Sequence, residues 1–355
     1  MMPTIKPHLS NLFRTPPAKT SRKHFLRLDM NESVDGLSEA FLAQALKQVN
    51  SQTLSTYPEY GELIESIAGH VDIPPDRICV SNGSDAAIRY IFDAYIGGGD
   101  TVLLTDPTFA MYPIYCRMYD AHAVSLGYHD DFTFPLEEYL TAIADGPKMA
   151  VMVNPNNPTG IALEPRDLET IITHCEQAGV LLVVDEAYYY YYPETVIRHV
   201  RTCRNLIVLR TFSKLCGLAG VRIGYLAACP DIVTDIYRVK PSFDVNCLAV
   251  LLARQVLDHP DIITREIAKI EGGKTYLLRR LKQNGVEFQT GKANFILIKC
   301  PGNKQMVIDR LHQKQILVSG TFQHPFLKDY IRITVGGKQS MKRFCDVFLN
   351  ILDTK

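Results

Sequence analysis

The chain has 355 residues, in which 38 Lys and Arg balance 38 Asp and Glu, so its formal net charge is zero. Hydrophobic residues make up 46% and charged residues 21%, a balance that excludes a disordered chain. The neutral total gives no electrostatic basis for nucleic acid as the main partner. No apolar run approaches the ~18 residues of a membrane-spanning helix, so no membrane partner is expected.

The first 27 residues carry six basic side chains and no acidic one. This composition would suit a transit peptide, but Pro16-Pro17 interrupts any helix there, and a solvated N-terminal arm is favoured. The nine cysteines include no Cys-x-x-Cys pair, and no secretory signal precedes them, so we expect free thiols in the cytoplasm. The ten histidines lack zinc-binding spacing, so no metal site is expected.

Between residues 60 and 230, short apolar runs alternate with amphipathic helical patterns such as Leu168–Ala178. The candidate strands are Ile78–Ser81, Thr101–Thr105, Ala123–Leu126, Met149–Val153, Val180–Val184, Leu206–Arg210 and Ile223–Ala227. Strands that are almost continuously Val, Ile and Leu predict an α/β sheet covered by helices on both faces.

The pattern changes near residue 240. A helical stretch from about Val245 to Asn284 leads to three shorter strands, Phe295–Lys299, Ile316–Val318 and Tyr330–Thr334. This order predicts a second, smaller α+β domain, against which the N-terminal arm is expected to pack. We expect residues 1–50 to form the arm and part of the small domain, 51–250 the large domain, and 251–355 the rest of the small domain.

Four predicted strands are followed by polar residues, where open α/β sheets bind their ligands. These segments are Asn82-Gly83-Ser84-Asp85, Asn154–Gly160, Asp185–Tyr188, and Thr211-Phe212-Ser213-Lys214 with Gly217, Gly220, Arg222 and Gly224 after it. Each alone has an ordinary structural explanation as a turn, a helix cap or a solvated lysine. The chain has no GxGxxG dinucleotide motif after a strand.

Taken together, in this order and spacing, these segments resemble the aspartate-aminotransferase-like, fold type I enzymes that use pyridoxal 5′-phosphate. The subgroup that they most resemble is that of histidinol-phosphate aminotransferase, and the likeness runs from Leu28 to Gly336. It implies a large domain with a mostly parallel seven-stranded sheet and a smaller α+β domain. It also implies transfer of an amino group between an amino acid, or a histidinol-phosphate-like amine, and a 2-oxo acid.

The resemblance implies that five residues bind the ring of the cofactor. Lys214 would hold the aldehyde as a Schiff base and move a proton at the substrate Cα, which needs a lysine of lowered pKa. Asp185 would stay ionised against the pyridine nitrogen and keep it protonated. Asn157 and Tyr188 match the donors to the ring 3′-oxygen, and Phe109 matches the aromatic that stacks on the ring. Without the resemblance, core packing would be favoured for Phe109.

The phosphate of the cofactor would be held by two groups of residues. Backbone N–H groups of Ser84 and Asp85 at a helix start would form one wall, with the Asp85 side chain capping the helix. Thr211, Ser213 and Arg222 match the opposite wall, where the arginine adds a charge-assisted contact.

Two further residues match positions of the family that bind the phosphate in the neighbouring subunit and the substrate. Tyr57 resembles the tyrosine that reaches the phosphate in the neighbouring subunit, which predicts a homodimer with composite sites. The alternative is an ordinary tyrosine before a proline turn. Arg332 matches the arginine that binds the anionic group of the substrate, because its planar fork suits a carboxylate.

The sequence departs from the subgroup at two positions. Asp35 stands where the subgroup has an aromatic residue, and Ser319 stands where it has an arginine. Both changes disfavour a phosphomonoester, so we expect an unphosphorylated α-amino acid as donor. If Asp35 lines the pocket, it favours a polar or cationic side chain; the alternative is a turn residue before Gly36.

The main rival is a pyridoxal-phosphate lyase, such as an amino-acid decarboxylase similar to threonine-phosphate decarboxylase. It shares the cofactor, and the outcome depends on which Cα bond stands perpendicular to the ring. A non-catalytic regulator is disfavoured, because the segment before residue 28 is too short for a DNA-binding domain.

Overall fold

The computed structural model describes residues 3–12, 20–322 and 324–353. Two of the six basic residues of the N-terminal segment, Arg14 and Lys19, lie outside the described residues, as does Pro16-Pro17. Within the described ranges, no helix combines the length and the apolar character that crossing a membrane requires.

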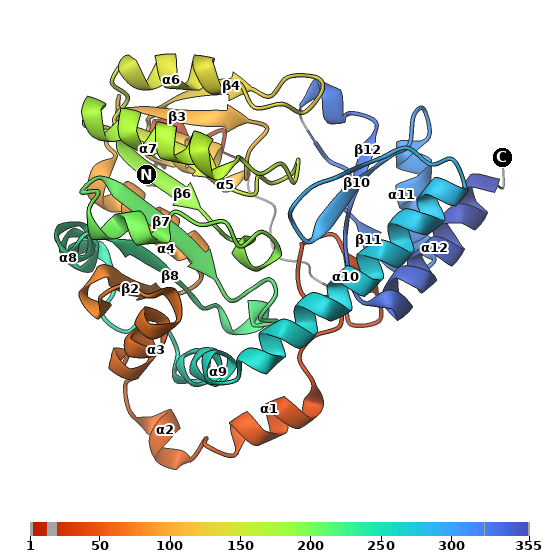
Figure 1. The fold of residues 1–355 in the computed structure, drawn as a ribbon, viewed down its shortest axis with the longest axis horizontal. Helices are drawn as coiled ribbons and strands as arrows, with labels where there is room; N and C mark the ends of the chain where they lie inside the picture. Colours follow the sequence, from red (N-terminus) through yellow and green to blue (C-terminus); the bar gives the residue numbers. More distant parts are fainter. Residues whose placement is uncertain (1–2, 13–19, 323, 354–355) are drawn as a thin grey trace.

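A seven-stranded sheet forms the large domain, as the sequence predicts (Figure 1). Its strands are β2 (Ile78–Ser81), β3 (Thr101–Asp106), β4 (His122–Gly127), β5 (Met149–Val153), β6 (Leu181–Asp185), β7 (Leu206–Thr211) and β8 (Gly224–Ala228). Their order across the sheet is β2-β8-β7-β6-β5-β3-β4, and only β8 runs antiparallel to its neighbours. The carboxyl ends of β5, β6 and β7 therefore lie side by side at one edge.

Helices cover both faces of this sheet (Figure 1). They are α3 (Gly61–Val71), α4 (Ser84–Tyr95), α5 (Met111–Met118), α6 (Leu136–Ala144), α7 (Pro165–Ala178) and α8 (Pro230–Val239). Alternate residues of β5 face opposite cores: Val151 packs in the cluster with α4, α5 and α8, and Met152 packs in the cluster with α6 and α7. Because both faces are buried, the strand is continuously apolar rather than alternating.

The small domain combines both ends of the chain. Its strands are β1 (Leu26–Leu28), β9 (Phe288–Thr290), β10 (Phe295–Lys299), β11 (Ile316–Val318) and β12 (Tyr330–Thr334), and its helices are α11 (Lys304–Gln313) and α12 (Lys338–Asp353). Strand β1 pairs in parallel with β11, while β9, β10 and β12 form an antiparallel sheet. Residues 25–28 of the N-terminal segment therefore pack on the C-terminal lobe as predicted, whereas His8 and Asn11, nearer its start, contact α5 of the large domain.

The helical stretch that was expected from about Val245 to Asn284 is two helices, α9 (Cys247–Asp258) and α10 (Pro260–Gln283). The break falls at His259, because Pro260 opens a new helix at its first position and cannot donate to a preceding turn. Helix α9 packs on α3 and α10 packs on α12. The expected boundary at residue 250 stays a prediction; it falls inside α9. Two short helices, α1 (Glu39–Leu46) and α2 (Ser51–Ser55), project beside α9 (Figure 1).

Six short 3-10 helices complete the described part of the fold. They are η1 (Pro7–Leu9), η2 (Pro75–Arg77), η3 (Tyr189–Tyr191), η4 (Ile197–Arg201), η5 (Ala219–Val221) and η6 (Pro325–Leu327). The third of them closely follows β6 and carries the middle of the run of five tyrosines.

Candidate active site

A cavity of about 250 Å³ lies at the carboxyl ends of β5, β6 and β7; we call it the strand-end cavity. It is lined by Met30, Glu32, Ser84, Asp85, Phe109, Val153, Asn157, Asp185, Ala187, Tyr188, Thr211, Ser213, Lys214, Ala219 and Arg222. Ten of these residues are ones that the sequence singled out. The fold thus brings together side chains that lie up to 192 positions apart, from Met30 to Arg222.

Lys214 stands in the loop after β7, and its Nζ donates to the carbonyl oxygen of Met30 at 3.3 Å. Burial, and next the positive charge of Arg332, lower the pKa of Lys214 to about 8. An amine with this pKa is partly neutral at physiological pH, which a nucleophile and proton carrier requires. The expected depressed pKa is present.

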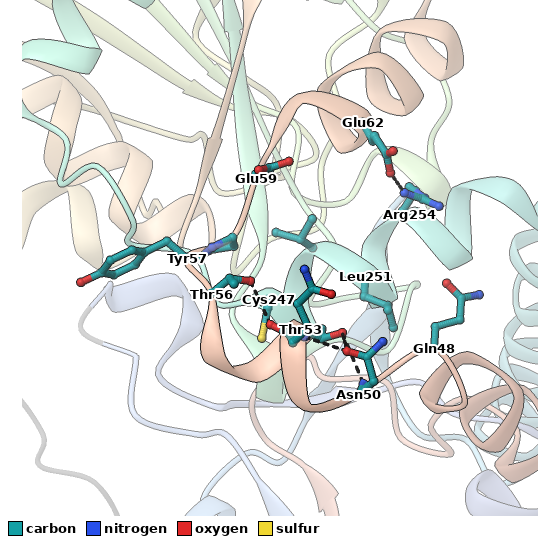
Figure 2. A pocket seen from close by; sticks show the side chains of 13 residues that line it. Gln48, Asn50, Thr53, Thr56, Tyr57, Glu59, Glu62, Cys247, Leu251 and Arg254 are labelled. Atoms are coloured by element: carbon teal, nitrogen blue, oxygen red, sulfur yellow. Dashed lines mark hydrogen bonds and ion pairs between the residues drawn. The ribbon is translucent and has the colours of Figure 1, made fainter.

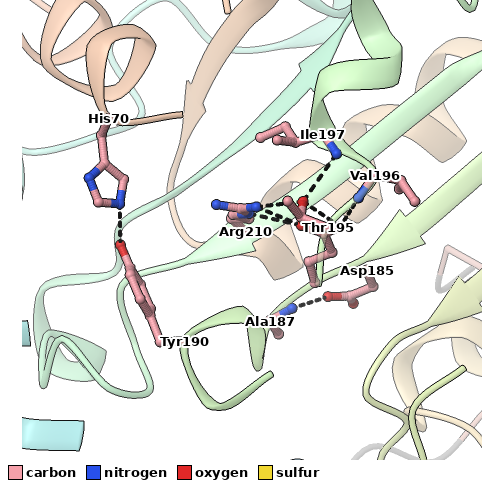
Figure 3. Close-up of polar contacts among 9 residues, drawn as sticks. His70, Asp185, Ala187, Tyr190, Thr195, Val196, Ile197 and Arg210 are labelled. Atoms are coloured by element: carbon pink, nitrogen blue, oxygen red, sulfur yellow. Dashed lines mark hydrogen bonds and ion pairs between the residues drawn. The ribbon is translucent and has the colours of Figure 1, made fainter. Parts of the chain in front are cut away.

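Asp185 ends β6 and is buried. Its Oδ2 accepts from the hydroxyl of Tyr112 at 2.9 Å, and its Oδ1 accepts from the backbone N–H of Ala187 at 3.1 Å (Figure 3). Burial raises the pKa of Asp185 to about 6, and the two hydrogen bonds oppose that rise. The carboxylate is therefore held in place and is mostly ionised at neutral pH.

Tyr188 and Asn157 meet in the cavity, since Nδ2 of Asn157 donates to the Tyr188 hydroxyl at 3.1 Å. The same hydroxyl accepts from Nδ2 of Asn31 at 2.8 Å. Burial raises the pKa of Tyr188 to about 12, so the phenol keeps its proton and can donate it to an oxygen in the cavity. Phe109 lines the same space, edge-on to Tyr112 with ring centroids 6.2 Å apart.

An anion cradle forms one end of the cavity. Helix α4 begins there without a side-chain cap, so its first N–H groups are unpaired within the helix. Gly83 has φ +78°, and a Cβ there would lie 2.5 Å from Nη2 of Arg222. Gly224 likewise lets Ser84 approach, because a Cβ would lie 2.7 Å from its nitrogen.

Three side chains complete the cradle. Thr211 Oγ1 donates to Ser213 Oγ at 2.9 Å, and Nη1 of Arg222 donates to the same Ser213 oxygen at 3.4 Å. Arg222 itself has φ +59°, a strained backbone conformation of the kind that collects at functional sites. The Asp85 carboxylate accepts from Tyr115 at 3.4 Å, and no capping bond to α4 is formed.

Arg332 lies on β12, next to the cavity wall. Its Nη1 donates to Oδ1 of Asn157, its Nη2 donates to the carbonyl oxygen of Asp29 at 3.0 Å, and its Nε is buried with no partner among the described residues. Burial lowers the pKa of Arg332, yet a guanidinium stays charged at neutral pH. Its two hydrogen-bond acceptors are neutral oxygens and its Cζ lies 5.2 Å from the centroid of the Phe295 ring, so no ion pair among the described residues neutralises its charge.

Asp35 does not line the strand-end cavity, so its role is the structural alternative and not that of a substrate contact. Its Oδ2 accepts from the N–H of Gly337 and its Oδ1 from Oγ of Ser340, both at 2.6 Å. The carboxylate therefore caps the N-terminus of α12, where negative charge is favoured. Ser319 also stays outside the lining residues; its backbone bridges to Arg332.

Tyr57 lies away from the strand-end cavity of its own chain. It is 74% exposed and stacks on the exposed ring of Phe243, with centroids 4.3 Å apart. It also borders a separate cavity of about 410 Å³ between α2 and α9. Figure 2 shows its ring pointing away from Thr56 and Cys247, outward from that cavity.

The sequence reasoning missed Tyr112, Asn31 and Glu32 as site residues. Tyr112 is one of 18 tyrosines, and its contact with Asp185 spans 73 positions, so no local pattern marks it. Asn31 and Glu32 lie within the stretch that carries the family likeness, which was the one available signal. Asn31 has φ +56°, which directs its side chain toward Tyr188.

A buried ion pair supports the site from behind. Glu186 Oε2 accepts from Nε and Nη2 of Arg210 at 3.0 and 2.8 Å, and Thr195 Oγ1 accepts from the same guanidinium at 2.7 Å (Figure 3). Glu186 follows Asp185 and Arg210 precedes Thr211, so the pair ties the ends of β6 and β7 together. Both side chains are at most 4% exposed.

This set of groups fits pyridoxal phosphate. The cradle offers N–H groups and a guanidinium to a phosphate, Asp185 offers a buried carboxylate to a cationic ring nitrogen, and Lys214 offers an amine of lowered pKa. When bound, the cofactor supplies an electron sink for negative charge at the substrate Cα. The groups at both ends of the cavity thus match both ends of the cofactor.

Comparison with known proteins agrees with this fit. The family model described as "Aminotransferase class I and II" matches residues 23–348. A histidinol-phosphate aminotransferase of Caldanaerobacter subterraneus is 33% identical over 92% of this chain and 93% of its own. One from Thermoanaerobacter sp. (strain X514) is 34% identical over 87% and 88%, respectively.

A solved structure extends the likeness to the fold. The histidinol-phosphate aminotransferase of Sinorhizobium meliloti, in complex with pyridoxal-5′-phosphate, superposes with a TM-score of 0.88 at 24% identity and covers 100% of this chain and 99% of that one. The fold type I architecture is thus confirmed. The chain belongs to the class I and II aminotransferase family and is a pyridoxal-phosphate-dependent aminotransferase.

Proposed function

We propose that the enzyme transfers the amino group of an unphosphorylated amino acid to a 2-oxo acid, with the carboxylate of each bound by Arg332. The observation that carries this proposal is the buried Arg332 guanidinium, which has neutral oxygens as its hydrogen-bond acceptors, forms no ion pair among the described residues and leaves Nε unpaired. A buried charge in this state is stabilised by a carboxylate, which a guanidinium binds through two parallel hydrogen bonds.

The arginines near Arg332 are already paired with carboxylates, which favours a substrate with one anionic group over a substrate with two. Arg22 pairs with Asp29, and Arg27 pairs with Glu32, whose side chain lines the cavity. Their charges are already compensated, whereas a phosphomonoester brings a charge of about −1.5 to −2. Since Ser319 adds no cation, a carboxylate matches the available charge better than a phosphate. Glu32 lines the cavity where Asp35 does not, but Arg27 compensates its charge, so it offers a polar contact to the donor.

In this proposal each polar group has one task. Lys214 carries the proton at the substrate Cα, Asp185 holds the ring nitrogen protonated, and Tyr188 with Asn157 donates to the ring oxygen. Phe109 covers the ring face. Arg332, held by Asn157, fixes the carboxylate so that the Cα proton rather than the carboxyl group is lost. The anion cradle of Ser84, Asp85, Thr211, Ser213 and Arg222 anchors the phosphate.

We further propose a homodimer in the cytoplasm. The stacked and exposed Tyr57 and Phe243 form an aromatic surface that a second copy would cover. A complementation experiment tests this: inactive Lys214→Ala and Tyr57→Ala chains, mixed and refolded, should regain activity, because one site per hybrid dimer has both residues. The cytoplasm is supported by the cysteines, since all nine are free thiols.

A screen of amino donors with 2-oxoglutarate tests the substrate. We expect turnover of unphosphorylated amino acids, and Arg332→Gln should raise KM for donor and acceptor alike by about 100-fold, as a charge-assisted contact is lost. The curated relatives are named for histidinol phosphate, so this amine is included. Turnover of that amine alone would refute an unphosphorylated donor. Release of carbon dioxide without amino transfer would favour a lyase.

A further inference from the structure

A second cavity, of about 400 Å³, lies on the other side of the tyrosine run from the strand-end cavity. We call it the tyrosine cavity. Its walls are η3, α10, the end of α3 and the loop between β9 and β10, and it shares no lining residue with the strand-end cavity. The volume falls within the range of small-molecule sites. The catalytic role of the tyrosine run ends at Tyr188, so the remaining tyrosines have no task in the reaction.

Two lysines give this cavity a positive side. Lys274 on α10 donates to the carbonyl oxygen of Gly291 at 2.7 Å, and Lys292 is the next residue of that loop. Burial lowers the pKa of Lys274, and the positive charge of Lys292 lowers it further. Glu271 is the only carboxylate among the described lining residues, so the two ammonium groups exceed the negative charge. An anion placed between the lysines would relieve their repulsion.

The rest of the lining of the tyrosine cavity is largely aromatic and apolar. Tyr190 and Tyr191 line it together with Ile267 and Ile270 of α10. The Tyr190 hydroxyl lies 3.3 Å from Nε2 of His70, on α3 (Figure 3). Burial and the charge of Arg210 lower the pKa of His70, so the imidazole is neutral near pH 7 and adds no further charge. These rings and methyl groups suit a flat, apolar body.

We propose that the tyrosine cavity is a second small-molecule site, which binds an aromatic carboxylate with its anionic group between Lys274 and Lys292 and its ring against Tyr190 and Tyr191. The ligand is a molecule distinct from the cofactor and does not require the donor proposed above. The inference therefore stands whether or not the substrate assignment is correct.

The walls of the tyrosine cavity are connected to the active site. The N–H of Lys292 donates to the carbonyl oxygen of Gly160 at 2.7 Å, at the end of the loop that carries Asn157. Tyr191 packs in one cluster with Tyr188, Ala293 and Phe295. A ligand in the tyrosine cavity thus contacts segments that also hold Asn157 and Tyr188. Binding there should change KM for the donor, and the donor should change the affinity of the ligand by the same factor.

Calorimetric titration of the holoenzyme with benzoate tests the proposal. Lys274→Met and Lys292→Met should each weaken binding by about tenfold, because each removes a charge-assisted contact. Glu271→Gln should strengthen binding, because it removes the opposing carboxylate. Lys282→Met is the matched control, since Lys282 lies on the same helix outside the tyrosine cavity and should leave the affinity unchanged.

Three outcomes would overturn the proposal. Benzoate affinity that depends on Arg332 but not on the two lysines would place the carboxylate in the active site. Equal binding of benzoate and of inorganic phosphate would show that the aromatic wall contributes nothing. Absence of any binding at millimolar benzoate would exclude the site. Failure of the donor screen has no bearing on these titrations, so the two proposals are tested separately.

Discussion

The Tyr112 hydroxyl donates to Oδ2 of Asp185 at 2.9 Å, and both side chains are buried. Tyr112 comes from α5 and Asp185 from the end of β6, so the bond joins a helix to the strand that carries the carboxylate. The pKa of Asp185 is raised to about 6 by burial, and this donor is the first influence that opposes the rise. Tyr112 is therefore a positioning residue that favours the ionised form of Asp185.

Tyr112→Phe should raise the pKa of Asp185 further and move the acidic limb of the pH–rate profile to higher pH. In the apoenzyme, a carboxyl whose folded pKa lies above its unfolded value of 3.8 contributes stability below about pH 4 and loses it as pH rises through about 6. In the variant, this loss of stability should continue to a higher pH. The difference in Tm between variant and parent should be larger at pH 8 than at pH 5.

Tyr139→Phe provides the control for that experiment. Tyr139 is as deeply buried and donates to the carbonyl oxygen of Val151 at 2.9 Å, away from any carboxylate. Its loss should lower Tm by a similar amount at both pH values. A Tm difference for Tyr112→Phe that does not vary with pH would contradict a role in the ionisation of Asp185.

Lys214→Ala should remove the visible absorbance of covalently bound cofactor and lower kcat by at least about 10²- to 10⁴-fold, because the proton carrier is lost. Lys214→Arg keeps the charge but has a pKa too high to release a proton at neutral pH. Both variants should therefore lose activity to this extent, although the arginine substitution preserves the positive charge in the cavity. Stopped-flow spectroscopy with an amino donor measures the loss, and a kcat within tenfold of the parent in either variant would refute the assignment.

Asp35→Ala should lower the free energy of unfolding by about 1 kcal/mol, because the N-terminus of α12 loses its cap. Asp35→Ser keeps a short acceptor and should lose less. Since Asp35 bonds Gly337 and Ser340 rather than the cavity, KM for each amino donor should stay constant in both variants. Urea unfolding and a donor panel give the two measurements; a changed donor preference would restore the role first considered for this residue.

Glu186→Gln should destabilise the fold by about 3–5 kcal/mol, because it leaves the buried guanidinium of Arg210 without its carboxylate. Adding Arg210→Met should recover part of that loss, since the double variant buries no charge. The unfolding free energies of the two single variants and the double variant form the required cycle. If the losses of the two single variants simply add in the double variant, Glu186 and Arg210 are not coupled.

Much of the large domain could be predicted from the sequence. The run Met149–Val153 is apolar at every position because both faces of β5 are covered, and that continuous pattern is visible without a structure. The strand ends then predict that Asn157, Asp185 and Lys214 share one edge, and the structure places all three around one cavity. Pro260 is a sequence signal for the break between α9 and α10. The apolar periodicity that continues on either side of it nevertheless favoured a single helix.

What the sequence could not give depends on contacts between distant segments. Nothing near Asp35 indicates that its carboxylate reaches α12, because the partners lie about 300 positions away. The same holds for Tyr112, whose bond to Asp185 depends on how α5 packs on the sheet. Side-chain hydrogen bonds across domains follow from the packed fold, whereas periodicity reports only which face of an element is buried.

The pairing of β1 with β11 also determines when the enzyme can become active. Leu26 meets Ile316, so this strand waits on the ribosome for a partner that is made 290 residues later. Asn31, which donates to the Tyr188 hydroxyl, lies three residues after β1, so the strand-end cavity also waits until β11 has been made. A nascent chain released before residue 316 should therefore have a folded large domain but an incomplete catalytic centre.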